Sequence, residues 1–274
     1  MSAADDAATD TTDATDALGA LGARFSLAGR TALVTGASRG IGAEICAVFA
    51  EAGADIVASA RDEAALDEVA ARVRATGRRC TCVSAELAEP EAVARLADAA
   101  LEAAGGTVDI LVNNAGIARV APALETTLEV WDEVMAVNVR AAFQLARALA
   151  PAMIAQRHGK IVNISSQAGT IGLDDHVAYS ASKAAMDAMT RGLMVEWARH
   201  GVQVNAICPT VILTPMGREV WGPGPHTDAV LARMPCRRFG EPREVADLAL
   251  YLASPASALV NGASVMIDGG FTAV

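Results

Sequence analysis

Short apolar runs alternate with longer segments of helical periodicity from Leu27 to the end of the chain. This alternation is typical of βαβ units, in which helices cover a parallel sheet. The apolar runs predict strands at Thr31–Thr35, Asp55–Ala60, Cys80–Ser84, Asp109–Val112, Lys160–Ser165, Val202–Cys208 and Ser264–Ile267. Helices are expected near residues 41–53, 62–76, 90–104, 128–156, 178–200 and 242–253. The pattern predicts an α/β protein with a doubly wound, seven-stranded parallel sheet, whose ligands bind at the carboxyl ends of the strands.

The first residues of the chain do not follow this pattern. Residues 1–22 are rich in Asp, Thr and Ala and poor in large apolar side chains, so they cannot offset the entropy cost of ordering. We expect residues 1–22 to form a disordered acidic tail. Residues 23–274 are expected to form a single domain, because a chain of 274 residues can be built around one core.

Charge and cysteine usage argue against several classes of function. The net charge of -10 at pH 7 disfavours nucleic-acid binding, which needs clusters of Lys and Arg. The 5 cysteines form no CxxC pair, so we expect neither a disulfide framework nor a metal site. The chain has no uncharged apolar run of about 18 residues and no signal-like start, so we expect no membrane contact and a cytoplasmic location.

A glycine-rich turn with the sequence TGASRGIG, Thr35 to Gly42, follows the first strand and opens the first helix. Glycine permits a tight turn and close approach of a pyrophosphate, whose charge is favoured at a helix N-terminus. Gly36, Gly40 and Gly42 suit these roles. Their spacing differs from the general GxGxxG pattern, and an ordinary strand-to-helix turn is the alternative. The context favours a dinucleotide phosphate site.

Two arginines bear on the form of the cofactor. In many dinucleotide folds an acidic residue after the second strand receives the ribose 2′-hydroxyl, whereas arginine accommodates a 2′-phosphate. Here Ala60 stands where the acid is expected, and Arg61 follows it. Together with Arg39 this favours NADP(H) over NAD(H). The alternative is that both arginines are solvated and that Asp62 reaches the ribose.

Tyr179 and Lys183 are the candidate hydride-transfer pair. They are four residues apart at the start of a predicted helix, so they share one helix face. A phenol with a pKa of about 10 is a poor proton donor or acceptor at neutral pH. We expect the Lys183 ammonium to lower the pKa of Tyr179. A surface pair is the alternative for such spacing alone.

Together, TGASRGIG, NNAG at Asn113 to Gly116, Asn138, Ser166 and YSASK at Tyr179 to Lys183 resemble the motifs of the short-chain dehydrogenase/reductase family. The resemblance covers residues from about 27 to 274. It implies a Rossmann-type fold and a homotetramer built through the two long helices near 128–156 and 178–200. It also implies a catalytic tetrad in which Tyr179 is the acid/base, Lys183 holds the nicotinamide ribose, Ser166 orients the carbonyl and Asn138 supports a water relay.

The resemblance also implies where the cofactor is bound. The stretch from Pro209 to Thr214 is expected at the nicotinamide carboxamide, and Asn113 is expected to be chiefly structural. Thr210 departs from the glycine of most members, and Glu86 from an aspartate that meets adenine. The implied cofactor-binding residues are Gly36, Ser38, Arg39, Gly40, Ile41, Gly42, Arg61, Glu86, Leu87, Asn114, Ala115, Gly116, Tyr179, Lys183, Pro209, Thr210, Ile212 and Thr214.

The segment from Cys208 to Gly217, followed by Trp221, resembles the branch that contains L-xylulose reductase and bacterial tetritol or polyol dehydrogenases. It implies a small ketose or polyol, or a related ketone or secondary alcohol, as substrate, and a substrate loop at about 213–235. The implied contacts are Ser166, Gln167, Leu173, His176 and Trp221. For His176 the alternative is a solvent-facing side chain, and for Trp221 an apolar anchor or subunit contact. Reduction of a 3-oxoacyl thioester and an inert NADP-binding sensor are the alternative functions.

Overall fold

Seven strands pair side by side in the computed structural model, which describes residues 19–274 apart from the side chains of Met216, Glu219 and Val220. All neighbouring strands are parallel, in the order β3-β2-β1-β4-β5-β6-β7. This confirms the predicted Rossmann-type, doubly wound sheet. The strands are β1 Thr31–Thr35, β2 Asp55–Ala60, β3 Cys80–Ser84, β4 Ile110–Asn113, β5 Gly159–Ile164, β6 Val202–Pro209 and β7 Ser264–Ile267.

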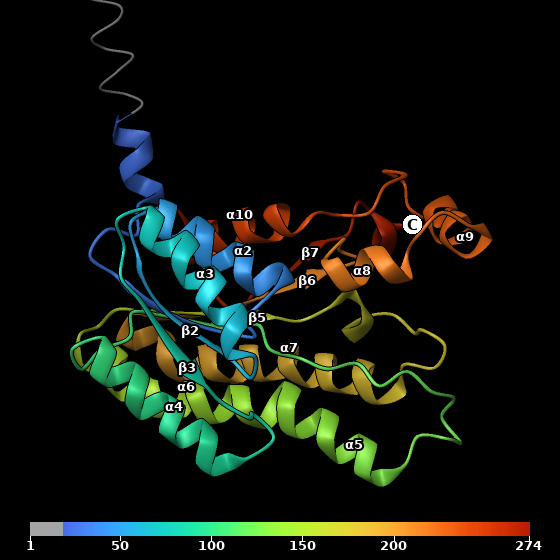
Figure 1. Ribbon diagram of the computed structural model, residues 1–274, viewed down its shortest axis with the longest axis horizontal. Coiled ribbons are helices and arrows are strands. Elements are labelled where there is room, and N and C mark those ends of the chain that lie inside the picture. The colour runs from blue at the N-terminus through green and yellow to red at the C-terminus, as the bar shows by residue number, and fades with distance from the viewer. Residues whose placement is uncertain (1–18) are drawn as a thin grey trace, which may run out of the picture.

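Helices cover both faces of the sheet and make it a three-layer sandwich (Figure 1). On one face lie α2 Gly40–Glu51, α3 Glu63–Ala75 and α10 Pro242–Ala253, whose apolar side chains share a core with Val34, Ile56 and Val112. On the other lie α4 Pro90–Ala103, α5 Leu128–Met135, α6 Ala141–Ala155 and α7 Val177–Trp197. None of the described helices is long and apolar enough to cross a membrane.

Three segments differ from the sequence-based expectation. The helix expected over 128–156 is interrupted, because a π-helical turn at Ala136–Arg140 separates α5 from α6. The expected substrate loop contains two short helices, α8 Pro215–Val220 and α9 Pro225–Arg233, each begun by a proline that fits the first helical turn. Residues 1–18 of the expected tail lie outside the described residues, and residues 19–25 are helical.

The order of the strands determines where a ligand can bind. The chain winds outward from β1 to β3 and then returns to place β4 on the other side of β1. The connections after β1 and β4 therefore leave the sheet toward opposite faces, which opens a crevice at the carboxyl ends of these two strands. The glycine turn follows β1, and Asn114 to Gly116 follow β4, so both border this crevice.

A buried lysine lies near the amino end of β5, at the end of the strands away from the crevice. Lys160 is 4% exposed, and its Nζ donates to the Ser254 carbonyl oxygen and to the Ser257 Oγ, each at 3.1 Å. Neither partner is charged. Burial lowers the pKa of Lys160 to about 8.

Lys160 should make the protein more stable as the pH rises above about 8. The folded-state pKa lies below the value of about 10.4 for an unfolded chain, so between these values the unfolded state binds more protons. In Lys160→Met this rise of the free energy of unfolding with pH should disappear, a difference on the order of 1–2 kcal/mol. Urea unfolding at pH 7.5 and 9.5 measures it. Equal pH slopes in both proteins would contradict the prediction.

Candidate active site

The glycine turn between β1 and α2 is closed against the chain that follows β4. Gly36 and Gly40 have φ of 63° and 58°, a conformation that favours glycine. A Cβ on Gly42 would lie 2.3 Å from the Gly36 carbonyl oxygen and 2.5 Å from the Asn114 Nδ2. These three glycines therefore have the conformations and spacing that the sequence predicts for a phosphate-binding turn.

Asn114 braces this turn from the neighbouring strand. Its Nδ2 donates to the Thr35 carbonyl oxygen at 2.8 Å and to that of Gly36 at 3.1 Å. The Thr35 hydroxyl in turn accepts from the backbone N–H groups of Asn114 and Ala115, each at 3.1 Å. The NNAG stretch thus fixes the turn as well as bordering the crevice.

Asn113 has a different, structural role. Its Nδ2 donates to the Asn163 Oδ1 at 2.8 Å, and the Asn163 Nδ2 donates to the Thr190 Oγ1 at 2.8 Å. All three side chains are buried and link β4, β5 and α7. This agrees with the expectation that Asn113 is chiefly structural.

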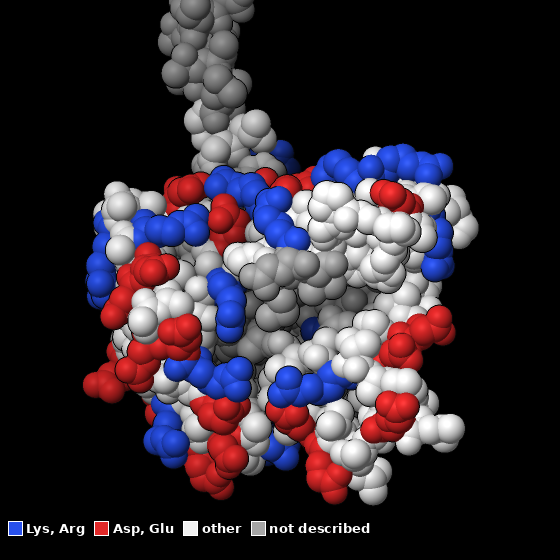
Figure 2. Space-filling view, turned by 45° about the vertical axis from the view of Figure 1, so that its right-hand side comes forward, with Lys and Arg blue, Asp and Glu red and all other residues white. Residues whose placement is uncertain are grey.

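A cavity of about 420 Å³ opens at the carboxyl ends of β1, β2, β3 and β4. Charged side chains of both signs surround the hollow on this face (Figure 2). The sequence reasoning did not include Ile117, Glu133 and Val137, which also line the cavity. The predicted cofactor residues in its lining are Gly36, Ser38, Arg39, Arg61, Glu86, Leu87, Asn114, Ala115 and Gly116.

The cavity fits the adenosine diphosphate part of a dinucleotide. A backbone turn without side chains at Gly36 and Gly42 provides room for a pyrophosphate at the N-terminus of α2. Arg39 is exposed beside the turn and forms no ion pair with the described residues. The described residues include no cluster of three or more His, Cys, Asp or Glu side chains that could hold a metal ion.

The predicted nicotinamide segment after β6 lies beside the glycine turn. A Cβ on Gly40 would be 2.9 Å from the Thr214 Cγ2. The Thr214 hydroxyl caps α8 by accepting from the Gly217 N–H at 3.0 Å. Thr210 and Ile212 line a smaller cavity of about 70 Å³, and the Thr210 hydroxyl is buried with no hydrogen-bond partner among the described residues. Contacts of Pro209, Thr210, Ile41 and Ile212 with a cofactor remain predictions.

Tyr179 and Lys183 lie in the first turns of α7 and face the end of β5. The Lys183 Nζ is almost fully buried and donates to the Ile164 carbonyl oxygen at 2.7 Å. It lies 5.6 Å from the centre of the Tyr179 ring. Ser166 follows β5, and its Oγ accepts from the Ala168 N–H at 3.1 Å, which leaves its hydroxyl proton available. The three predicted side chains thus meet at one site.

The expected lowering of the pKa of Tyr179 is wrong for this structure. Burial raises the pKa of the phenol, and the neighbouring Ser166 hydroxyl acts in the opposite direction. Lys183 is aimed at the Ile164 carbonyl oxygen, and its own pKa is lowered to about 8 by burial. Spacing along a helix therefore brought the two groups together but did not reveal the effect of desolvation.

Asp187, one turn after Lys183, was missed by the sequence reasoning. Its carboxylate is 6% exposed and raises the pKa of Lys183 against the larger effect of burial. The Cys208 thiol lies 3.8 Å from its Oδ1. A carboxylate four residues from a lysine, on the apolar face of a helix, was the available signal.

Asn138 lies in the π-helical turn and is fully buried. Its Oδ1 accepts from the Ile117 N–H at 2.8 Å, and its Nδ2 donates to the Ile117 carbonyl oxygen at 3.0 Å and to the Ser182 Oγ at 2.9 Å. The Ser182 hydroxyl donates to the Tyr179 carbonyl oxygen at 2.7 Å. Asn138 therefore links the loop after β4 to the helical turn that carries Tyr179.

Three of the predicted substrate contacts lie in the chain between Ser166 and Tyr179. Gln167 is buried directly after Ser166, and its Oε1 has no hydrogen-bond partner among the described residues. The rings of His176 and Tyr179 are 6.2 Å apart, and the His176 Nδ1 pairs with the Asp174 carbonyl oxygen. Leu173 is partly exposed in the loop before α7.

Trp221 has a packing role at the end of α8. Its ring stacks on His226 at 4.8 Å and meets the edge of Phe239 at 5.4 Å. These aromatic contacts hold the substrate loop against the small apolar cluster of Met234, Phe239 and Phe271. The alternative of an apolar anchor therefore describes its observed packing, and contact with substrate remains a prediction.

Known proteins resemble the chain over most of its length. A family model described as enoyl-(acyl carrier protein) reductase matches residues 36–272. A protein named D-threitol dehydrogenase from Mycolicibacterium smegmatis is 43% identical over 251 residues, which cover 90% of this chain and 95% of that protein. A protein named NAD-dependent glycerol dehydrogenase from Listeria innocua is 40% identical over 248 residues, which cover 90% of this chain and 96% of that protein.

A solved structure has the same architecture. The crystal structure of a gluconate 5-dehydrogenase from Burkholderia cenocepacia in complex with NADP and tartrate superposes with a TM-score of 0.87 at 38% identity. The match covers 93% of this chain and 99% of that chain. The sequence and structure comparisons therefore agree over nearly the whole described chain.

Replacing Gly42 with alanine should disable the turn, because the added methyl group would overlap the Gly36 carbonyl oxygen and the Asn114 amide. We expect NADPH to bind at least about tenfold more weakly, a loss of roughly 1.4 kcal/mol. Gly192→Ala is the matched control, since a Cβ on Gly192 in α7 meets nothing within 4 Å. Calorimetric titration measures both. Unchanged affinity in a folded Gly42→Ala protein would contradict the role of the turn.

Proposed function

The chain belongs to the short-chain dehydrogenase/reductase family and is an alcohol dehydrogenase/carbonyl reductase, and on that premise we propose that it transfers a hydride between NADP(H) and a small ketose or polyol. Related ketones and secondary alcohols belong to the same proposed substrate class. The buried Gln167 Oε1 beside Ser166, unpaired among the described residues, is the observation that carries this choice.

A polyhydroxylated substrate fits the polar groups around Tyr179. An unpaired buried acceptor is costly, and a substrate hydroxyl that donates to the Gln167 Oε1 removes that cost. The Ser166 hydroxyl keeps a proton to donate, and the outer nitrogen of His176 adds a second polar group on a ring that lies 6.2 Å from the Tyr179 ring. A site built of such groups discriminates against molecules that lack matching hydroxyls. Relatives named for threitol and glycerol support the same class.

The proposed proton chemistry uses four side chains. Bound NADP(H) supplies or accepts the hydride. The Ser166 hydroxyl orients the substrate oxygen, and the Tyr179 hydroxyl gives it a proton in reduction or takes one in oxidation. Lys183, with a pKa of about 8, is cationic at neutral pH and stabilises the phenolate as it forms. Asn138, through Ser182, holds the backbone of Tyr179 in place.

NADP(H) is the proposed cofactor because two guanidinium groups line the cavity, and arginine is a side chain that accommodates a 2′-phosphate. The two groups belong to Arg39 and Arg61. Asp62, the alternative partner for a ribose hydroxyl, is engaged as the cap of α3, where its Oδ1 accepts from the Ala65 N–H at 3.1 Å. One similar structure contains NADP, and one relative is named as NAD-dependent.

We also propose that the enzyme is a cytoplasmic homotetramer. Each of the helices α5, α6 and α7 carries an exposed apolar side chain, namely Leu128, Phe143 and Val195, which are 77%, 43% and 72% exposed. A shallow groove beside Phe143 is lined by Met135, Val139 and Met189. Such a patch is typical of a surface that a second copy covers. The buried cysteines are free thiols, which suits a reducing compartment.

A substrate panel tests the proposed reaction. NADPH oxidation should proceed with erythrulose and xylulose, and Tyr179→Phe should lower turnover by roughly 10²- to 10⁴-fold while NADPH binding is retained. As a control, the NADPH affinity of Tyr179→Phe is measured by titration and should equal that of the unchanged protein. Turnover of an acetoacetyl thioester alone would select the thioester alternative, to which the description of the family model points. Cofactor binding without turnover of any carbonyl would select the inert sensor.

Light scattering tests the assembly. The mass in solution should be four times the 28.0 kDa of one chain, and Phe143→Glu should yield smaller species because it places a charge in the apolar patch. Ala64→Glu, in the exposed first turn of α3 on the other face of the sheet, is the matched control. A tetramer unaffected by Phe143→Glu would place the contact elsewhere.

A further inference from the structure

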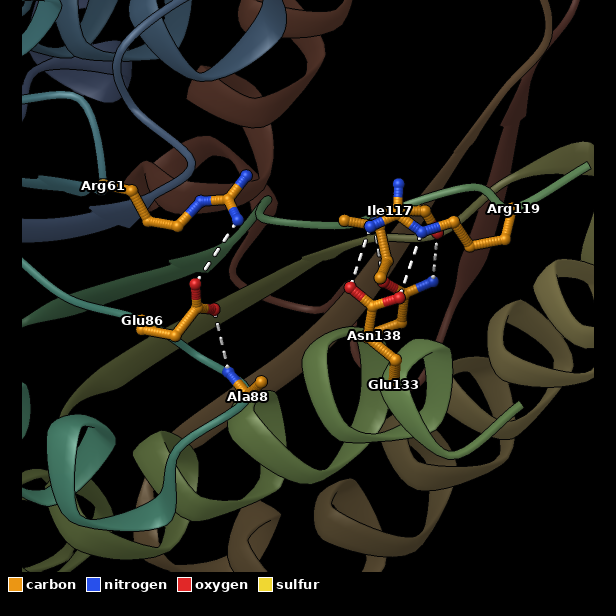
Figure 3. Close-up of polar contacts among 7 residues, drawn as sticks. All are labelled: Arg61, Glu86, Ala88, Ile117, Arg119, Glu133 and Asn138. Carbon is orange, nitrogen blue, oxygen red and sulfur yellow. Dashed lines mark hydrogen bonds and ion pairs between the residues drawn. The ribbon is translucent and has the colours of Figure 1, made fainter. Parts of the chain in front are cut away.

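An ion pair crosses the mouth of the cofactor cavity. The Arg61 Nη1 lies 3.3 Å from the Glu86 Oε2, with the two side chains 66% and 44% exposed (Figure 3). The other carboxylate oxygen of Glu86 accepts from the Ala88 N–H at 3.2 Å. Both oxygens of Glu86 are thus used, one to fix the carboxylate and the other to hold the guanidinium of Arg61.

The sheet brings these two residues together. Ala60 at the end of β2 is in register with Ser84 at the end of β3, and the Ala85 N–H donates to the Ala60 carbonyl oxygen at 3.2 Å. Arg61 and Glu86 therefore leave neighbouring strands at the same edge. The extra methylene of glutamate, compared with aspartate, gives the carboxylate its reach toward Arg61.

Besides the neighbouring Asp62, acidic side chains from two other segments act on Arg61. Glu86 contacts it directly, and Glu133 on α5 also lines the cavity. Glu133 is itself paired with Arg119 through two hydrogen bonds, at 2.8 and 3.0 Å, as Figure 3 shows. Glu86 is thus the acid that competes directly for the Arg61 guanidinium.

We propose that Glu86 is a specificity-determining residue that restrains Arg61 and lowers the preference for NADP(H) over NAD(H). A 2′-phosphate and the Glu86 carboxylate need the same guanidinium, so the carboxylate weakens the contact of Arg61 with the phosphate. NAD(H) carries no phosphate at this position, so its binding is not opposed in this way. This inference rests on the proposed role of Arg61 as a receptor for the 2′-phosphate.

Glu86→Gln removes the charge but keeps the length of the side chain and an oxygen for the Ala88 N–H. Exposed ion pairs contribute up to about 1 kcal/mol, so NADPH binding should improve about three- to fivefold relative to NADH binding. The ratio of NADPH to NADH affinity should rise by the same three- to fivefold, because any contact of Glu86 with adenine, which both cofactors carry, cancels in that ratio. Glu89→Gln is the matched control: Glu89 is an exposed acid three residues along the chain that does not line the cavity.

A double-mutant cycle with Arg61→Leu separates this inference from the proposed function. When Arg61→Leu is already present, adding Glu86→Gln should no longer alter the ratio of NADPH to NADH affinity, measured by titration at constant ionic strength. A persistent gain in the double variant, or equal changes for both cofactors, would overturn the role of Glu86. A null effect of Glu86→Gln combined with weak NADPH binding by Arg61→Leu would overturn this inference alone. Full NADPH affinity in Arg61→Leu would overturn the proposed role of Arg61 itself.

Discussion

The site depends on the close contact between the glycine turn after β1 and the chain after β4. Asn114 donates to two carbonyl oxygens of that turn, and no side chain fits between them. Because β1 and β4 are neighbours whose connections leave toward opposite faces, this contact also closes the inner end of the crevice. A cofactor phosphate can approach the N-terminus of α2 only because backbone occupies this place.

A second set of buried hydrogen bonds holds α7 in position over the crevice. Asn138 reaches Ser182, Ser165 donates to the Lys183 carbonyl oxygen at 3.1 Å, and Asn163 donates to Thr190. Each such bond contributes on the order of 1 kcal/mol, whereas an unpaired buried partner costs more. The network therefore specifies one placement of the helix, and with it the position of Tyr179 and Lys183 relative to Ser166 and the end of β5. Precise placement of this kind is what proton transfer requires.

The charges at the site act through contacts between neighbouring side chains and not through the net charge of the protein. In the proposed function a chain with a net charge of -10 binds an anionic cofactor, and the two arginines that line the cavity, Arg39 and Arg61, follow β1 and β2. Those arginines stand among acids such as Glu86 and Glu133, whose position decides how much of the positive charge a ligand encounters. Lys183 follows the same rule, since burial and the Asp187 carboxylate act on its pKa in opposite directions.

Features that depend on neighbours along the chain could be predicted from the sequence. The strands, the glycine turn and the shared helix face of Tyr179 and Lys183 follow from periodicity and spacing, which local backbone geometry determines. Only the tertiary structure decided that the pKa of Tyr179 is raised and that a π-helical turn buries Asn138. It also decided the packing of Trp221 and the pairing of Arg61 with Glu86. Each of these depends on burial or on contact between residues distant in the sequence, and neither is encoded in local spacing.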